Sequence, residues 1–227
     1  MFRIFFISVM ILFAASNCRS KPDIKPTQAS KSSAVVFEVK HKMPFQMFGN
    51  PSFSEIWIIK VDEKAKSYAN MELIKVNYVS GSRFYLLNIV PGQYVVAAGK
   101  RFQKGGDAQP ETNYWIVFDK PSMDKSKFTV RPGELANLGE FTIDASTVPP
   151  DQDPALLQIG EKIYPGFGDS LTKKMISAIG VALLGGTVNV PSIGLVSEHN
   201  KSPEKIEAIK KEVKEDFEET EWSSLVK

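Results

Sequence analysis

Cysteine and histidine are scarce in this sequence, whose 227 residues contain one cysteine and two histidines. A single cysteine excludes a disulfide within the chain, so the folded part must be held together by its hydrophobic core. The histidines, His41 and His199, lack the spacing of a metal site, and we interpret both as surface or packing residues. A Gly-x-Ser-x-Gly elbow and a glycine-rich phosphate loop are also missing. We therefore expect no catalytic residue, no metal site and no cofactor, and a protein that is not an enzyme.

An excess of charge of one sign is lacking as well. The 28 basic residues are balanced by 26 acidic ones, which gives a formal net charge of +2 at pH 7. This balance offers no electrostatic basis for binding nucleic acid, so we expect no nucleic-acid partner. Hydrophobic residues make up 43% of the chain and aromatic residues 11%, as in an ordinary globular protein of one or two small domains.

The main apolar run lies at the N-terminus and ends at Ala15. One basic residue precedes it, and small or polar residues follow it, which is the layout of a secretory signal peptide over residues 1–17. The run is too short to span a bilayer as a permanent helix. We therefore expect the protein to be exported and its leader to be removed.

Cys18, the single cysteine, directly follows this leader. The segment Leu12–Cys18, LFAASNC, resembles a bacterial lipobox of the relaxed type found in spirochaetes, with Ala15 and Asn17 where most lipoboxes carry Leu and then Gly or Ala. The resemblance implies cleavage between Asn17 and Cys18 and attachment of a diacylglycerol to the Cys18 thiol. The alternative is an ordinary signal peptide that is cut near Ala15 and leaves Cys18 as a free thiol.

Residues 18–33 comprise the lipidated cysteine and a predicted tether. Beyond the cysteine they are polar and contain two prolines, so we expect them to stay flexible. Arg19 and Ser20 stand where an aspartate would mark retention at the inner membrane. Lipidation would therefore place the protein at the outer membrane, on either its periplasmic or its surface side.

The body of the chain, residues 34–146, alternates short runs rich in β-branched and aromatic residues with turn-forming residues. The predicted strands cover residues 35–39, 55–61, 71–76, 83–90, 93–98, 113–118, 126–131 and 136–143. Seven or eight short strands at this spacing predict a mainly β fold, an antiparallel β-sandwich.

A proline–glycine turn is the most distinctive pattern of this body. Pro91 and Gly92 separate two apolar strands, and Tyr94 is expected to return its ring to the sheet. With a second such turn at Pro132, these residues resemble the prealbumin-like or carboxypeptidase-regulatory-like sandwiches of secreted bacterial proteins. The resemblance implies a binding, spacing or scaffold role and no particular chemistry.

An insertion over residues 101–112 departs from the pattern of these sandwiches. It contains Gly105, Gly106 and Asp107, which predict a long exposed hairpin loop. Such a loop is a candidate contact for a partner. The alternative is a mobile connection that binds nothing.

Residues 147–153 form a proline-rich linker before a helical C-terminal region over residues 154–227. We expect Asp153 to cap the first helix and not to bind calcium, because the spacing of a calcium loop is missing. An apolar run over residues 175–186 is shorter than a membrane span. We favour a buried helix there over one that inserts into membrane or packs against another helix.

The last predicted helix, residues 202–222, carries apolar residues at steps of three and four. We expect this stripe to dock on the protein's own body, and binding to a partner's groove is the alternative.

These features predict a non-enzymatic cell-envelope protein that is anchored in the outer membrane by its N-terminal lipid and binds a protein partner of unknown identity. The alternative is an envelope structural protein that assembles with itself through residues 175–186 or the C-terminal helix.

Overall fold

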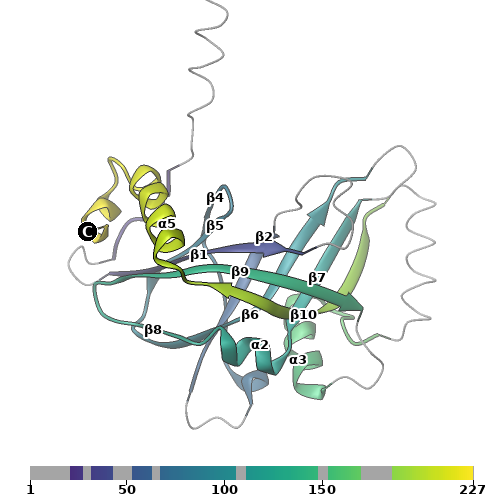
Figure 1. Ribbon diagram of the computed structural model, residues 1–227. Coiled ribbons are helices and arrows are strands. Elements are labelled where there is room, and N and C mark those ends of the chain that lie inside the picture. The colour runs from purple at the N-terminus through teal and green to yellow at the C-terminus, as the bar shows by residue number, and fades with distance from the viewer. Residues whose placement is uncertain are drawn as a thin grey trace, which may run out of the picture.

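The computed structural model describes residues 21–27, 32–42, 53–62, 67–105, 111–147, 153–169 and 186–226. Most of them belong to one curled β-sheet of ten strands (Figure 1). The strands are β1 (Ser33–His41), β2 (Phe53–Lys60), β3 (Leu73–Lys75), β4 (Tyr78–Ser80), β5 (Arg83–Ile89), β6 (Gly92–Gln103), β7 (Thr112–Phe118), β8 (Phe128–Val130), β9 (Leu135–Thr147) and β10 (Val188–Asn200). The helices are α2 (Lys120–Lys125), α3 (Pro154–Ile163) and α5 (Pro203–Asp216), with 3-10 turns η2 (Tyr68–Asn70) and η3 (Glu221–Leu225).

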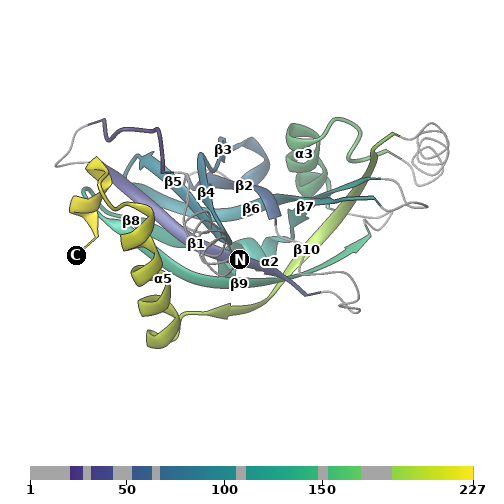
Figure 2. The ribbon, with the colours of Figure 1, turned by 90° about the horizontal axis from the view of Figure 1, so that it is seen from above.

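The strand order of the sheet is β3-β2-β6-β7-β10-β9-β1-β5-β4, and β8 pairs with the start of β6. Two pairs, β1 with β9 and β7 with β10, are parallel. The other pairs are antiparallel. The sheet curls into a half-barrel, which Figure 2 shows from above.

The predicted antiparallel β-sandwich is therefore wrong, because the structure has one mixed sheet instead of two antiparallel layers. The reason is β10, which lies in the region that was expected to be helical. It inserts between β7 and β9, parallel to the first and antiparallel to the second. Residues on both sides of the predicted linker 147–153 consequently belong to the same sheet.

Strand β1 shows that the sheet has two hydrophobic faces. Its first seven residues, SAVVFEV, are all buried. Successive side chains of a strand point to opposite faces. Val35 and Phe37 accordingly belong to one core, and Ala34 and Val36 belong to another. A strand that is buried on both faces does not alternate apolar with polar residues, and its sequence gives no sign of which face is inside.

The inner core fills the concave side of the half-barrel. It joins side chains from strands that are far apart in the sheet order, such as Ile58 of β2 and Phe37 of β1. The Phe37 ring contacts Phe84 and Phe141, with ring centroids 6.0 and 5.9 Å away. Helix α2 adds Met123 to the same core. These contacts hold the two halves of the curled sheet together.

The outer core lies between the convex face of β1 and β5 and the C-terminal segment. Tyr85 and Leu87 of β5 pack there with Val213 of α5, Phe217 and Trp222, and each of these residues is almost fully buried. The apolar stripe of the last predicted helix thus docks on the protein's own body, as expected. Figure 1 shows α5 lying across this side of the sheet.

Both predicted helix caps with an aspartate or serine are present. The Oδ1 atom of Asp153 accepts a hydrogen bond from the backbone N–H of Ala155 at 2.8 Å, at the start of α3. The Oγ atom of Ser202 accepts one from the N–H of Lys205 at 3.3 Å, at the start of α5. Each side chain satisfies a backbone donor that the first helical turn leaves free.

The insertion over residues 101–112 is shorter than expected, because β6 continues through Gln103. Arg101, which was expected to lie in an exposed loop, has only 3% of its surface exposed. Of the predicted partner-contact residues, Gly105 lies just beyond β6, whereas Gly106 and Asp107 lie outside the described residues.

Candidate functional site

The N-terminal segment, residues 21–27, is attached to the C-terminal end of the chain. The indole N–H of the buried Trp222 donates to the carbonyl oxygen of Ile24 at 2.6 Å, and Ile24 packs against the outer core. The Lys21 ammonium forms an ion pair with Glu219 at 2.7 Å. These residues belong to the stretch 18–33 that was expected to be a flexible tether.

A second attachment holds the same segment to the end of β5. The Oδ1 atom of Asn88 accepts hydrogen bonds from the backbone N–H and the hydroxyl of Thr27, at 2.9 and 3.0 Å. Its Nδ2 donates to the carbonyl oxygen of Lys25 at 2.8 Å. Asn88 adopts a φ of 59°, a left-handed conformation that asparagine tolerates better than most residues. Residues 21–27 therefore follow a defined path along the body.

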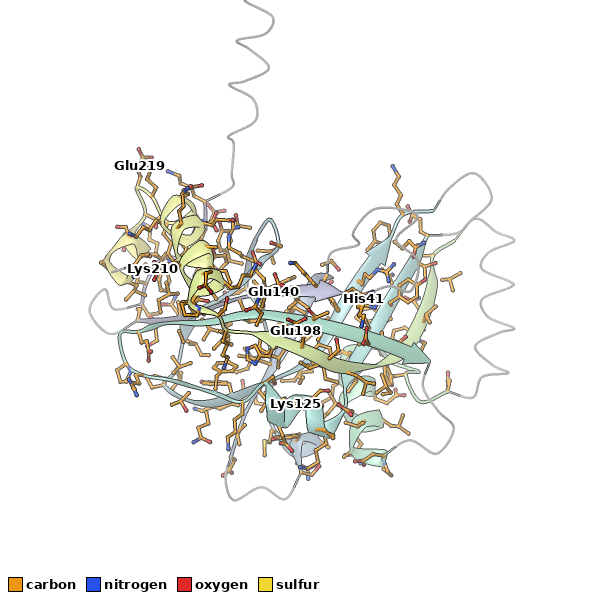
Figure 3. All side chains as sticks on the ribbon, in the orientation of Figure 1. His41, Lys125, Glu140, Glu198, Lys210 and Glu219 are labelled. Atoms are coloured by element: carbon orange, nitrogen blue, oxygen red, sulfur yellow. The ribbon has the colours of Figure 1, made fainter. Side chains whose placement is uncertain are left out.

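A groove opens at the same end of the molecule, between α5 and the start of β9. Its volume is about 380 Å³. It is lined by Val36, Gly133, Glu134, Leu135, Asn137, Ile206, Glu207, Lys210, Val213, Leu225 and Val226. Figure 3 shows Lys210 on α5 at the same end as Glu219. Apolar side chains predominate in this lining, and Glu134, Glu207 and Lys210 add charge. Such a groove suits an apolar segment flanked by charged residues.

The end of α5 is fastened to the sheet by a buried polar cluster. Asp216, which is 1% exposed, accepts hydrogen bonds from Arg83 through Nε at 2.8 Å and Nη2 at 3.1 Å. The Ser80 hydroxyl donates to the same carboxylate at 2.7 Å, and the Tyr85 hydroxyl donates to it as well. Arg83 also contacts Glu212 of α5.

The protonation states of Tyr85 and Arg83 suit a structural role for this cluster. Burial, followed by the hydrogen bond to Asp216, raises the pKa of Tyr85 far above its ordinary value, so its hydroxyl stays protonated. Burial alone would lower the pKa of Arg83, but Asp216 and Tyr85 raise it, so Arg83 stays charged. The cluster therefore positions α5, one wall of the groove.

A second ionic cluster holds the start of α5. The Lys205 ammonium contacts the carboxylates of Glu38 on β1 and Glu140 on β9, the latter at 2.7 Å. Lys40 contacts Glu140 at 2.7 Å. Burial would raise the pKa of Glu140, but Lys205 and then Lys40 lower it below its ordinary value. Lys205 thus joins α5 to β1 and β9 through two carboxylates.

The remaining predicted site residues are only partly described. Asn17, Cys18 and the apolar run up to residue 185 lie outside the described residues. His199 packs as expected, with its ring 4.0 Å from that of Phe141 and its Nε2 2.7 Å from the Leu138 carbonyl oxygen. Within the described ranges, no group of side chains is arranged to hold a metal ion, and no helix is long and apolar enough to cross a membrane.

The residues that position α5 and the N-terminal segment were not predicted from the sequence. Asp216 could have been noticed, because it lies between Val213 and Phe217 on an apolar stripe, where an acid needs a buried partner. Trp222 gave a weaker signal as a large aromatic residue directly after the helix.

Comparison with protein-family models, with curated proteins and with solved structures finds no match to this chain. The lipobox resemblance therefore stays a prediction that rests on the residues around Cys18.

Proposed function

We propose that this protein is a non-enzymatic, lipid-anchored protein of the bacterial outer membrane that binds a protein partner in the groove beside α5. The lipobox-like segment that ends at Cys18 supports the anchor. The observation that carries the proposal is the attachment of residues 21–27 to the C-terminal segment, because Trp222 and Glu219, which hold that segment, belong to the same part of the chain as Leu225 and Val226 of the groove.

The chain length between anchor and body is short. Cys18 precedes Lys21 by three residues, which span at most about 11 Å. A lipid on Cys18 would therefore keep the α5 end of the body close to the membrane surface. The partner that this arrangement favours is a protein in or on the same membrane, with an apolar segment for the groove and charges that complement Glu207 and Lys210.

The anchor is tested by Cys18→Ala, with Ser20→Ala as the matched control. We expect the parent and the control to sediment with membranes after a carbonate wash and the Cys18→Ala protein to be released. Mass spectrometry of the mature N-terminus should show acyl chains on Cys18. A Cys18→Ala protein that stays in the membrane fraction would refute lipid anchoring.

The attachment of the N-terminal segment is tested by Trp222→Ala, with the exposed Ser224→Ala as control. Loss of the indole removes the bond to Ile24 and part of the outer core, so endoproteinase Asp-N should cleave before Asp23 several times faster than in the parent. An unchanged cleavage rate in a folded Trp222→Ala protein would mean that the attachment does not restrain the segment.

The groove is tested by placing a photo-crosslinking amino acid at Ile206, inside it, or at Lys211, on the exposed side of α5. In intact cells we expect a defined crosslinked protein from position 206 and none from 211, and we expect Leu225→Glu to abolish the product. A crosslink only to a second copy of the chain would favour the self-assembly alternative.

A further inference from the structure

On the inner face of the sheet, the buried Arg101 has no carboxylate partner among the residues that the structure describes. Arg101 of β6 has 3% of its surface exposed. Its Nη2 donates to Oε1 of Gln103 at 2.9 Å, and its guanidinium lies over the Tyr114 ring, 4.6 Å from the ring centroid. Its Nε, also buried, has no acceptor. Burial lowers the pKa of Arg101, and the one group that opposes this effect is Tyr114, not a carboxylate.

A second polar side chain without partners lies beside this arginine. His41 ends β1, and both of its ring nitrogens are buried and have no hydrogen-bond partner. Its ring contacts Phe53, with centroids 6.2 Å apart, and Phe53 pairs with Arg101 across β2 and β6. Figure 3 shows His41 on the side of the molecule away from Lys210 and α5. This cluster is thus separate from the groove.

Unpaired donors of this kind are unusual in a protein interior. Buried polar groups are almost always hydrogen-bonded, and a buried charge is normally paired. Within the described part of the chain, Nε of Arg101 and both ring nitrogens of His41 lack hydrogen-bond partners.

We propose that Arg101 and His41 bind the carboxylate of a small organic acid on the inner face of the half-barrel. The planar fork of a guanidinium matches a carboxylate, and an imidazole supplies one further donor. One permanent positive charge balances a monoanion better than a dianion such as phosphate. The ring of Phe53 offers an apolar surface for the hydrocarbon part of the acid. This site is independent of the proposed anchor and of the groove.

The proposal is tested by thermal melting of the purified full chain in acetate, butyrate, octanoate, phosphate or chloride at equal ionic strength. We expect a saturable rise in melting temperature with a monocarboxylate and none with chloride. Arg101→Met should abolish this rise and should melt at a higher temperature than the parent in chloride, because it removes a buried charge that lacks a partner. The exposed Arg131→Met should change neither result.

Three outcomes would overturn the proposal: no carboxylate response in the folded parent, an equal response in Arg101→Met, or a larger response to phosphate. If Arg101→Met does not fold, His41→Gln and Arg101→Lys take its place. We expect each of these to weaken carboxylate binding at least tenfold while the chain stays folded, and binding equal to that of the parent would count against the site.

Discussion

The protein buries one arginine on each face of its sheet, and the two have opposite surroundings. Arg83, on the outer face, and Arg101, on the inner face, each expose 3% of their surface. Arg83 has two hydrogen bonds to Asp216 and further contacts with Tyr85 and Glu212. Arg101 has one neutral acceptor and an aromatic ring.

The difference between the two arginines separates a structural role from a binding role. The Arg83 cluster ties α5 to β4 and β5 and so positions one wall of the groove. Arg101 ties no second element to β6 through an ion pair, although its burial costs free energy. The hydrogen bonds of Arg83 account for its burial, because they hold α5 on the sheet. The contacts of Arg101 do not account for its burial, which is why we propose a ligand for it.

The largest expected effect on stability comes from removing Asp216, the buried acid beside Arg83, which makes the surroundings of Arg83 more like those of Arg101. Asp216→Ala leaves Arg83 buried without its carboxylate and removes the acceptor of the Ser80 and Tyr85 hydroxyls. We expect it to lower the free energy of unfolding by about 3–5 kcal/mol. Urea denaturation followed by tryptophan fluorescence measures this, because Trp222 lies in the same core.

The control for this variant is Glu218→Ala, an exposed acid two residues further on, which should change the free energy of unfolding by less than about 0.5 kcal/mol. A loss below about 1 kcal/mol for Asp216→Ala would show that the outer cluster does not hold the C-terminal segment.

Features that depend on neighbouring residues could be predicted from the sequence, and features that depend on distant residues could not. Helices α3 and α5 begin where Asp153 and Ser202 predicted, because a cap depends on residues within one turn. Strand β10 was not predicted, since Pro191 and Gly194 interrupt its β pattern and its partners are distant in sequence. Pro191 lies where β10 pairs with β7 alone, so its missing N–H removes no bond to β9.

The same argument explains why neither arginine could be recognised from sequence. Arg83 follows a turn, and Arg101 stands in the polar stretch Lys100–Gln103, so both appear exposed in the sequence. Their burial depends on α5 and on the curl of the sheet, and local sequence patterns encode neither. The break at Pro91 between β5 and β6 and the burial of Tyr94, whose hydroxyl donates to the carbonyl oxygen of Val90, were predictable because they depend on residues close in sequence.

A smaller effect on stability is expected from giving Arg101 an acid partner like the one that Arg83 has. Gln103→Glu places a carboxylate where the amide oxygen now accepts from Arg101 at 2.9 Å. We expect the free energy of unfolding to rise by about 1–2 kcal/mol, since a charged acceptor makes the stronger hydrogen bond. The variant should also lose its response to butyrate, because the new carboxylate occupies the guanidinium.

Urea denaturation with and without butyrate measures both effects, and the exposed Gln158→Glu of α3 is the matched control. A Gln103→Glu protein that is less stable than the parent would contradict the view that Arg101 lacks an acid.

The smallest expected effect is a dependence of stability on pH. Part of it comes from His41 beside Arg101, and the rest comes from other parts of the fold. Burial, and then the charge of Arg101, lowers the pKa of His41 below 6.5, while Asp144 of β9 acts in the opposite direction. Burial also lowers the pKa of His199. As the pH falls below about 6.5, the unfolded chain binds more protons than the folded one, so the free energy of unfolding must decrease. Glu140, whose lowered pKa lies below 4.5, contributes only in more acidic solution.

A bound carboxylate should change the His41 part of this dependence alone. A carboxylate beside the ring favours the protonated form, so in saturating butyrate the loss of stability between about pH 7.5 and pH 5.5 should shrink to the part that His199 contributes. In His41→Gln the loss should be equally small with and without butyrate. Urea midpoints at the two pH values measure it. An identical loss with and without butyrate in the parent chain would mean that the anion does not contact His41, and Arg101 would then be the only remaining candidate for a direct contact.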